Sequence, residues 1–194
     1  MLEGVSQHDL ILDIARDGFA HRGIAATTIQ DIADRAGVSK ASVLYHFSSK
    51  DQLVDAALEP SLEALSELLD SLADDPLSSA ESQRAFLERF VDFLINHRLA
   101  AHIVVSHPYL ADESKSLGRA TVLMGLLAER VSQAGLGDFD RLRFGVAVSG
   151  ATYALVSAGQ LGVEQMSNDE LRPMLTDVLR EMTGLSAPSE QVTS

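Results

Sequence analysis

The chain has 194 residues, 46% of them hydrophobic, a formal net charge of −13 at pH 7, and no cysteine. This length allows one or two domains with a substantial core, and the lack of cysteine excludes a disulfide framework and a thiolate metal site. Because no stretch approaches 18 uninterrupted apolar residues and no charged start leads into an apolar signal region, we expect a soluble, cytoplasmic protein without a membrane partner.

Residues 27–50 have the pattern of two short helices joined by a tight turn. Thr27, followed three residues later by Gln30, is a capping box that predicts a helix beginning near Thr28. Gly37 comes after the last apolar position of that helix, where a left-handed residue is often needed. The pattern indicates a helix-turn-helix, which lays one helix in the major groove of DNA.

The second helix of the pair begins after a favourable N-cap, Ser39, and is predicted to run to about Phe47. Val43, Leu44 and Phe47 can supply its inward face. Ser49, followed by Gln52, is a further capping box and predicts the start of the next helix.

The chemistry of this region suits DNA. From Arg35 to Lys50 there are three basic residues and no acidic one, and several small or hydrogen-bonding side chains suit phosphates and base edges. Lys50 in the first turn of a helix opposes the helix dipole at a cost of a few tenths to about 1 kcal/mol. A phosphate docked on that terminus would remove the conflict. Glycine-joined helix pairs also occur in other helical proteins, where Tyr45 and Phe47 would simply be core.

The segment from about Asp9 to Leu58 resembles the DNA-binding domain of the TetR family of bacterial regulators. The matching pieces are Ile-Leu-Asp-Ile-Ala (11–15) with Phe19 and Gly23, Thr-Thr-Ile-Gln-Asp-Ile-Ala (27–33), Ala-Gly-Val-Ser-Lys (36–40), Tyr-His-Phe (45–47), and Ser49 and Lys50 with Leu53.

The resemblance implies a set of residues that face DNA, with Lys50 and Tyr45 on phosphate and with Ala41 and Ser42 nearest the base edges. Leu44 departs from the family, which often has an aromatic residue there, and removes one possible hydroxyl contact with phosphate. The predicted DNA-binding residues are Thr28, Ser39, Lys40, Ala41, Ser42, Tyr45, His46 and Lys50.

The acidic charge is concentrated away from this region, since residues 1–58 carry a net charge of −3 and residues 59–194 carry −10. The aspartates of the first region must then lie on faces away from DNA. Because non-specific affinity comes from neutralising phosphates, we expect it to be weak, so that specific binding depends on a paired, symmetric contact.

The rest of the chain reads as helices. Pro60 falls within a helical pattern and is expected to kink it, and residues 74–77 form a break. The expected helices cover residues 50–72, 78–96 (with Ser78 and Glu81 as a capping box), 99–106, 114–134 (closed by Gly135 and Gly137), 141–162, and a last one capped by Ser167 and Glu170.

The last two helices have the features of a dimer interface. Small residues recur every four positions between Arg141 and Gly162, which suits close approach of another helix, and the final helix carries a regular apolar stripe. Arg141, Arg143 and Gln160 argue against the alternative of a membrane span. The predicted interface residues are Ala147, Ala151, Ala154, Ala158, Gly162, Leu171, Met174, Leu175, Val178 and Met182.

The resemblance further implies an all-α fold, with an N-terminal three-helix helix-turn-helix domain (1–50), a C-terminal helical ligand-binding and dimerisation domain (51–186) and a flexible tail (187–194). It implies a homodimer on double-stranded DNA with a palindromic operator, and a small-molecule effector in a C-terminal cavity. Candidate effector-binding residues, chosen by polarity within apolar helices, are Phe86, Phe90, Phe93, His102, Ser106, Tyr109, Arg119, Leu123, Met124 and Tyr153. Core packing is the alternative for the three phenylalanines, and a surface position is the alternative for Arg119.

Catalytic and metal functions lack support. His97, His102 and His107 are spaced by five residues, which rotates each about 140° from the last on a helix, so that they cannot share one face. No nucleophile elbow or glycine-rich phosphate loop occurs. We therefore expect no enzyme activity, no cofactor and no metal.

Two functions remain open. The first is a dimeric transcriptional repressor that a small molecule releases from its operator. The second is a helical small-molecule-binding or adaptor protein without specific DNA binding, which Leu44 and the acidic balance favour.

Overall fold

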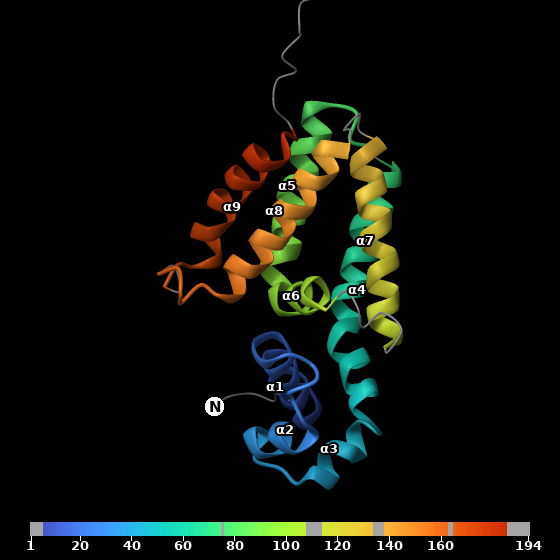
Figure 1. Ribbon diagram of the computed structural model, residues 1–194, viewed down its shortest axis with the longest axis vertical. Coiled ribbons are helices and arrows are strands. Elements are labelled where there is room, and N and C mark those ends of the chain that lie inside the picture. Colours follow the sequence, from blue (N-terminus) through green and yellow to red (C-terminus); the bar gives the residue numbers. More distant parts are fainter. Residues whose placement is uncertain (1–5, 75, 108–113, 134–137, 163–164, 186–194) are drawn as a thin grey trace, which may run out of the picture. The chain divides into compact units, whose positions relative to one another are not determined.

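The computed structural model describes residues 6–74, 76–107, 114–133, 138–162 and 165–185. Within these ranges the secondary structure is helical and no strand occurs, as the all-α prediction requires (Figure 1). The helices are α1 (Gln7–Arg22), α2 (Ile29–Ala36), α3 (Lys40–His46), α4 (Lys50–Asp74), α5 (Ala80–Asn96), α6 (Arg98–Ser106), α7 (Lys115–Gln133), α8 (Asp138–Val156) and α9 (Asn168–Thr183).

The contacts divide the chain into two compact units. The N-terminal unit comprises residues 1–63 and 99–122, and the C-terminal unit comprises residues 64–98 and 123–194, so that α4 and α7 each contribute to both. This division by contacts differs from the division by motif, and the domain bounds that we expect at residues 50 and 186 stay a prediction. The predicted tail lies outside the described residues.

The core of the N-terminal unit is formed where α1, α2 and α3 pack against one another. Phe19, Ile32, Val43 and Leu53 are all buried, one from each of the first four helices. α1 begins at Ser6, whose hydroxyl accepts the backbone N–H of Asp9. The short α2 and α3 could not persist alone, because helices of this length are marginal in water, so this shared core holds them in place.

α5 begins one residue later than the sequence pattern predicts. The N-cap is Ser79, whose hydroxyl accepts the backbone N–H of Ser82, while the Ser82 hydroxyl takes the place of the expected Glu81 carboxylate. Ser78 and Ser79 are equally suitable caps, so the local pattern does not choose between them.

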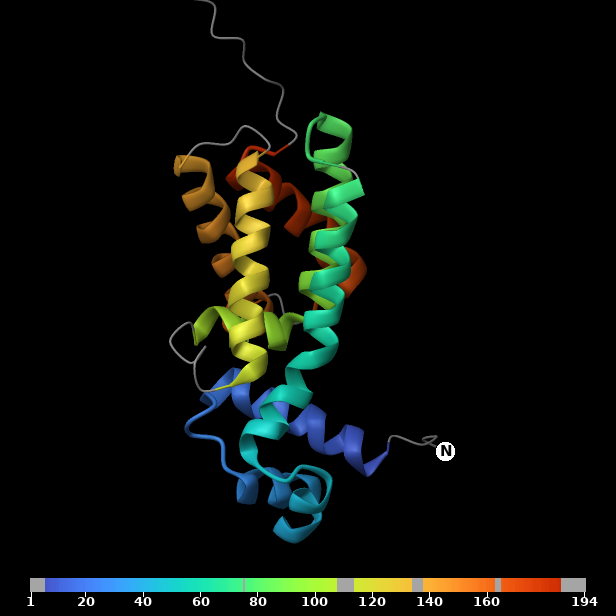
Figure 2. The same ribbon diagram turned by 90° about the vertical axis from the view of Figure 1, so that its right-hand side faces the viewer.

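In the C-terminal unit, α9 packs along both α5 and α8 (Figures 1 and 2). Phe90 is stacked between Phe86, at 5.5 Å between ring centroids, and Phe144 of α8, at 5.7 Å. Phe86 and Phe90 are almost fully buried. These rings therefore serve the packing of α5 on α8, the core role that was the alternative for them.

The helix predicted over residues 141–162 ends at Val156, and residues 157–162 form turns. Gly162 has a left-handed φ of 70°. It is therefore not part of a helix, although we expect it to be an interface residue on the helix over residues 141–162. The four-residue spacing of small residues continues through these turns, where the backbone is no longer helical. The end of α7 is predicted at Gly135 and Gly137, which lie outside the described residues.

α9 follows its prediction closely. The Ser167 hydroxyl accepts the backbone N–H of Glu170, and the Glu170 carboxylate accepts the backbone N–H of Ser167 at 2.8 Å. Gly184 closes the helix in the left-handed conformation, with φ at 71°. Across the described residues, no helix is long and apolar enough to cross a membrane.

Candidate functional site

α2, the turn at Gly37 and α3 form the helix-turn-helix that residues 27–50 predict. Gly37 is left-handed, with φ at 69° and ψ at 30°, and the following residue, Val38, donates its backbone N–H to the Ala33 carbonyl. Ser39 then caps α3 by accepting the backbone N–H of Ser42 at 3.1 Å. The glycine closes one helix and the serine opens the next, so a single turn sets the direction of α3.

The cap of α2 lies one residue beyond its predicted position. Thr28, not Thr27, accepts the backbone N–H of Asp31, and the Asp31 carboxylate accepts the backbone N–H and the hydroxyl of Thr28. Thr27 is buried instead and donates its hydroxyl to the Gly23 carbonyl. Gln30 is not part of the cap, because its amide bonds Asp34.

This cap places a carboxylate on the first turn of α2. The backbone N–H and then the hydroxyl of Thr28 lower the pKa of Asp31, which is therefore ionised at neutral pH. The Thr28 hydroxyl both donates to Asp31 and accepts from it. The contact of Thr28 with DNA that we predict would have to form beside this negative charge.

α3 has one buried face and one open face. Val43 and Phe47 are buried, as predicted, whereas Leu44 is 39% exposed and does not belong to the inward face. Tyr45 is 87% exposed, which rules out the alternative of a core tyrosine. Val43 and Phe47 are one helical turn apart, and Leu44 is rotated about 100° from Val43, which explains why it leaves the core.

The open face of α3 carries the small and basic residues that the sequence pattern singles out. Ser39, Lys40 and Ala41 are exposed, and Ser42 is partly exposed. Lys40 makes no hydrogen bond or ion pair with any described residue, so its ammonium is available to an external anion. No acidic residue lies in the first turn of α3, which leaves the positive end of its dipole open to phosphate.

A residue that the sequence pattern does not single out, Gln7, joins this face. The Gln7 side-chain oxygen accepts the Ser42 hydroxyl at 3.3 Å and lies 3.2 Å from Nε2 of His46. His46 also packs edge-on against the ring of Tyr45. Gln7 is the first residue of α1, so the beginning of α1 contributes to the surface beside α3. The Ser6 cap is the only local signal that could have placed it at a helix end.

Lys50 stands at the start of α4, as predicted. Its ammonium donates to the Ala25 carbonyl at 3.2 Å, in the segment between α1 and α2. An ammonium has three donors, so this bond holds Lys50 in position and leaves donors for a phosphate. The Ser49 hydroxyl accepts the backbone N–H of Gln52, but the Gln52 side chain bonds the backbone N–H of Ser48 rather than that of Ser49.

Asp13 and Asp17 are bound by arginines within the unit. Arg35 donates to Asp17 at 2.6 Å, and Arg16 donates to Asp13 at 2.9 Å. The charge of Arg35 is therefore matched, and Lys40 and Lys50 are the lysines that this region presents. The arrangement can hold phosphates beside α3 while small side chains approach base edges.

The profile of bacterial regulatory proteins of the tetR family matches residues 11–57, which span the helix-turn-helix described above. The chain carries a TetR-family segment. Its TetR segment contains the caps, the Gly37 turn and the exposed face of α3.

Two relatives and one solved structure are similar to this chain. It is 35% identical over 113 residues to the HTH-type transcriptional repressor KstR2 of Mycolicibacterium smegmatis, over 58% of this chain and 52% of the relative. It is 51% identical over 63 residues to an HTH-type transcriptional regulator of Mycobacterium bovis, over 32% and 34% of the two chains. This chain spans about half, or less, of the length of these curated relatives.

A TetR-like transcriptional regulator from Rhodococcus sp. RHA1 has the same fold along almost the whole chain. The TM-score is 0.62 at 23% identity, over 95% of this chain and all of the other. The likeness in fold thus extends over both units, whereas the family profile matches residues 11–57.

In the C-terminal unit, α8 and α9 line an apolar groove of about 310 Å³. All the predicted interface residues except Gly162 line it, and Gly150, Leu155 and Leu161 also contribute. Met174 and Val178 are about half exposed, although apolar residues at helical spacing normally face a core. Ala158 lines the groove from the turn beyond α8, not from the helix itself.

The predicted effector-binding residues are divided between the two units, and none of them lines the α8–α9 groove. Phe93 stacks on His97, and the Tyr153 hydroxyl donates to the Gln160 side chain from a half-exposed position on α8. Leu123 is buried and Met124 is partly buried on α7. Tyr109 lies outside the described residues.

The remaining candidates belong to the N-terminal unit. Arg119 forms an ion pair with Glu59 on the surface, the alternative that we gave for it. Nε2 of His102 lies 3.2 Å from the Ser106 hydroxyl, and burial, followed by the nearby His107 and His21, lowers the pKa of His102. Within the described residues, no group of three His, Asp or Glu side chains could hold a metal ion.

Proposed function

We propose that this chain is a DNA-binding transcriptional repressor that binds a palindromic operator as a homodimer and is released by a small-molecule effector. The observation that carries the proposal is the open surface of α3, where Tyr45 is 87% exposed, Lys40 is exposed in the first turn and acidic residues are absent. A tyrosine so exposed on a packed helix contributes nothing to the core, so a partner that takes up its ring and hydroxyl explains its position.

The face divides into phosphate-binding and base-reading parts. Tyr45, Lys40 and Lys50 provide a hydroxyl and two ammonium groups for phosphate, at the two ends of α3. Ala41 and Ser42 occupy the first turn between them, and their small side chains allow close approach to base edges. Gln7 positions Ser42 and His46 and adds an amide at the edge of the face.

The α8–α9 groove is proposed as the surface for a second copy of this chain. Its walls are alanine and glycine on α8 and long apolar side chains on α9, a combination that lets a helix approach closely and still bury large apolar groups. A symmetric pair would place two α3 helices on half-sites about one DNA turn apart. Doubling the contact compensates for the weak non-specific affinity expected of an acidic protein.

Release by an effector requires that its binding favour a spacing of the two α3 helices that does not fit DNA, a coupling of typically about 1–3 kcal/mol. The apolar interiors of the helical C-terminal unit suit an apolar or aromatic molecule. A regulator of this kind works by binding alone and catalyses no reaction.

The test is fluorescence anisotropy with duplexes selected from a random pool by the purified protein, at a stated salt concentration. Tyr45→Ala and Lys40→Ala should each weaken specific binding by about tenfold. Arg89→Ala, which removes an exposed arginine on α5, serves as the matched control and should bind like the parent. Circular dichroism checks that the variants stay folded.

Equal binding by all three variants would refute the placement of the DNA-binding face on α3. Failure of the folded parent to enrich any sequence would favour the second function, a helical ligand-binding or adaptor protein without specific DNA binding.

A further inference from the structure

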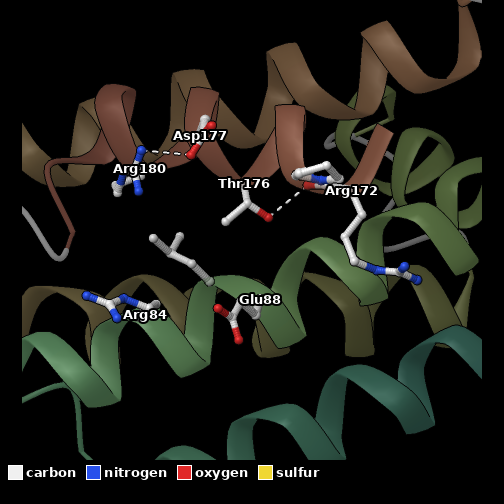
Figure 3. A pocket seen from close by; sticks show the side chains of 8 residues that line it. Arg84, Glu88, Arg172, Thr176, Asp177 and Arg180 are labelled. Atoms are coloured by element: carbon white, nitrogen blue, oxygen red, sulfur yellow. Dashed lines mark hydrogen bonds and ion pairs between the residues drawn. The ribbon is translucent and has the colours of Figure 1, made fainter. Parts of the chain in front are cut away.

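A second groove, of about 340 Å³, lies between α5 and α9 in the C-terminal unit (Figure 3). None of the residues assigned above to DNA, effector or dimer contacts lines it. Leu87, which is almost fully buried, Pro173 and Thr176 give it apolar surface, and charged side chains surround this surface. The groove thus combines an apolar base with a polar rim, as sites for small ligands commonly do.

Arginine dominates the rim. Arg84 of α5 and Arg180 of α9 lie at the same end of the groove on facing helices, and Arg172 lies toward the other end (Figure 3). The lining carries three arginines beside Glu88 and Asp177, in a chain whose net charge is −13. These two guanidinium groups of Arg84 and Arg180 come from separate helices to one end of the groove, and an anion between two like charges offsets their repulsion.

The donors of this pair are largely unused by the protein. Arg84 makes no hydrogen bond or ion pair with any described residue, and Glu88, one helical turn later, does not pair with it. Arg180 makes one ion pair, at 2.7 Å, with Asp177, and both side chains are about half exposed or more. An exposed pair three residues apart contributes only a few tenths of a kcal/mol, and a guanidinium has five N–H donors.

Arg172 differs from this pair because it is already neutralised. It donates to Asp92 of α5 and, at 3.0 Å, to Asp169 in the first turn of its own helix. The bond to Asp92 joins α9 to α5 at this end of the groove. Arg172 therefore shapes the groove, and Arg84 and Arg180 have donors to spare.

We propose that the α5–α9 groove binds a small amphipathic carboxylate, with the carboxylate between Arg84 and Arg180 and the apolar body on Leu87, Pro173 and Thr176. The guanidinium fork matches the two oxygens of a carboxylate. The apolar base favours a ligand with a hydrocarbon or aromatic body over a bare inorganic anion. Glu88 opposes the carboxylate by like charge and limits the affinity.

The proposed site stays accessible in the proposed dimer. Pro173, Thr176 and Arg180 recur at helical spacing on one face of α9, and Met174 and Val178, which line the α8–α9 groove, lie on the opposite face. A second copy on one face of α9 leaves the other face free, so the carboxylate site does not depend on the oligomeric state.

The experiment is isothermal titration calorimetry of the full-length protein with octanoate, octan-1-ol and inorganic phosphate as probes. We expect saturable binding of octanoate, weakened about tenfold or more by Arg84→Gln and by Arg180→Gln. Arg89→Gln, outside the groove on α5, is the matched control and should change nothing. Glu88→Gln should strengthen binding several-fold, because it removes the opposing charge. Octan-1-ol and phosphate should each bind much more weakly than octanoate.

Three results would overturn the proposal, and thermal melts of each variant exclude loss of folding as their cause. Octanoate binding that is unchanged in both groove variants would place the ligand in another cavity. No saturable binding at millimolar octanoate would remove the site. Phosphate binding as tight as that of octanoate would show that the apolar base contributes nothing and that the ligand class is wrong.

Discussion

The carboxylate of Asp55 accepts the backbone N–H of Ser116 at 2.9 Å, across 61 residues of sequence. The Ser114 hydroxyl donates to the same oxygen at 2.8 Å. Asp55 lies on α4, and Ser116 lies in the first turn of α7. An acidic side chain from one helix thus satisfies the free N–H groups at the beginning of another, which fixes where α7 starts within the N-terminal unit.

Asp55→Ala should lower the free energy of unfolding by about 1.5–3 kcal/mol at neutral pH, because it leaves the N–H and hydroxyl donors of α7 unpaired. Urea denaturation followed by circular dichroism measures this change. Glu63→Ala, which removes an exposed carboxylate on the same helix, is the control and should be close to neutral. A similar loss in both variants would mean that charge on α4, rather than this cap, is responsible.

The same bond predicts how stability depends on pH. Burial alone would raise the pKa of Asp55, but the hydrogen bonds from Ser116 and Ser114 and the nearby charge of Lys115 outweigh burial and lower it below 3.8. A carboxyl whose pKa is lower in the folded state stabilises the protein above its unfolded pKa, and this stabilisation is lost as the pH falls through the folded pKa. The difference between the parent and Asp55→Ala should therefore shrink below about pH 3.8.

Lys40→Ala should also reduce the salt dependence of operator binding. Each phosphate contact contributes a slope of about −0.9 to the plot of log binding constant against log salt concentration, so a dimer that loses one contact per protomer should lose about 2 from the slope. Anisotropy titrations at several salt concentrations give this value. A weaker complex with an unchanged slope would indicate that Lys40 contacts bases, not phosphate.

Ala154→Trp, in the middle of the α8–α9 groove, should convert the proposed dimer to a monomer in sedimentation velocity experiments. The indole would fill the space that a helix of the second copy needs, and overpacking of this kind typically costs about 1–3 kcal/mol or more. Glu129→Trp places the same side chain on an exposed position of α7 and should leave the dimer intact. A dimer of unchanged stability in Ala154→Trp would place the interface elsewhere.

Two glycine substitutions should have opposite effects on stability. Gly37→Ala forces a side chain into a left-handed conformation, with φ at 69°, and should destabilise the protein by about 1–2 kcal/mol even though the space around it is open. Gly125 lies within α7 with nothing near its missing Cβ, so Gly125→Ala should stabilise by about 0.5–1 kcal/mol. Thermal melts measure the change in stability of each variant. Changes of the same sign in Gly37→Ala and Gly125→Ala would contradict this account.

The sequence predicts the helix-turn-helix well because its signals are local. Ser39 as a cap, Gly37 as a left-handed turn and the burial of Val43 each follow from neighbouring residues. The errors arise where two neighbours offer the same chemistry. Thr27 and Thr28 are both good caps, and the choice falls on Thr28 because Thr27 is buried against Gly18, a contact that the local pattern does not contain.

Other features depend on contacts across long stretches of sequence. Gln7 reaches Ser42 and His46 from 35 residues or more away, and no periodicity announces it. Arg84 and Arg180 line one groove only because α5 packs along α9. The end of α8 is predicted wrongly for a different reason. Small residues recur every four positions up to Gly162, but the helix ends at Val156 and the residues after it form turns.

The acid-free first turn of α3 belongs to a chain of net charge −13, and this contrast affects how the protein finds DNA. At very low salt the Debye length is long, about 30 Å at 0.01 M, so DNA meets the net charge of the whole protein and repels it. Only at closer range do the lysines and the α3 dipole act. We therefore expect the association rate to rise as salt is added from very low concentration, the reverse of electrostatic steering, and sliding along random DNA to be brief.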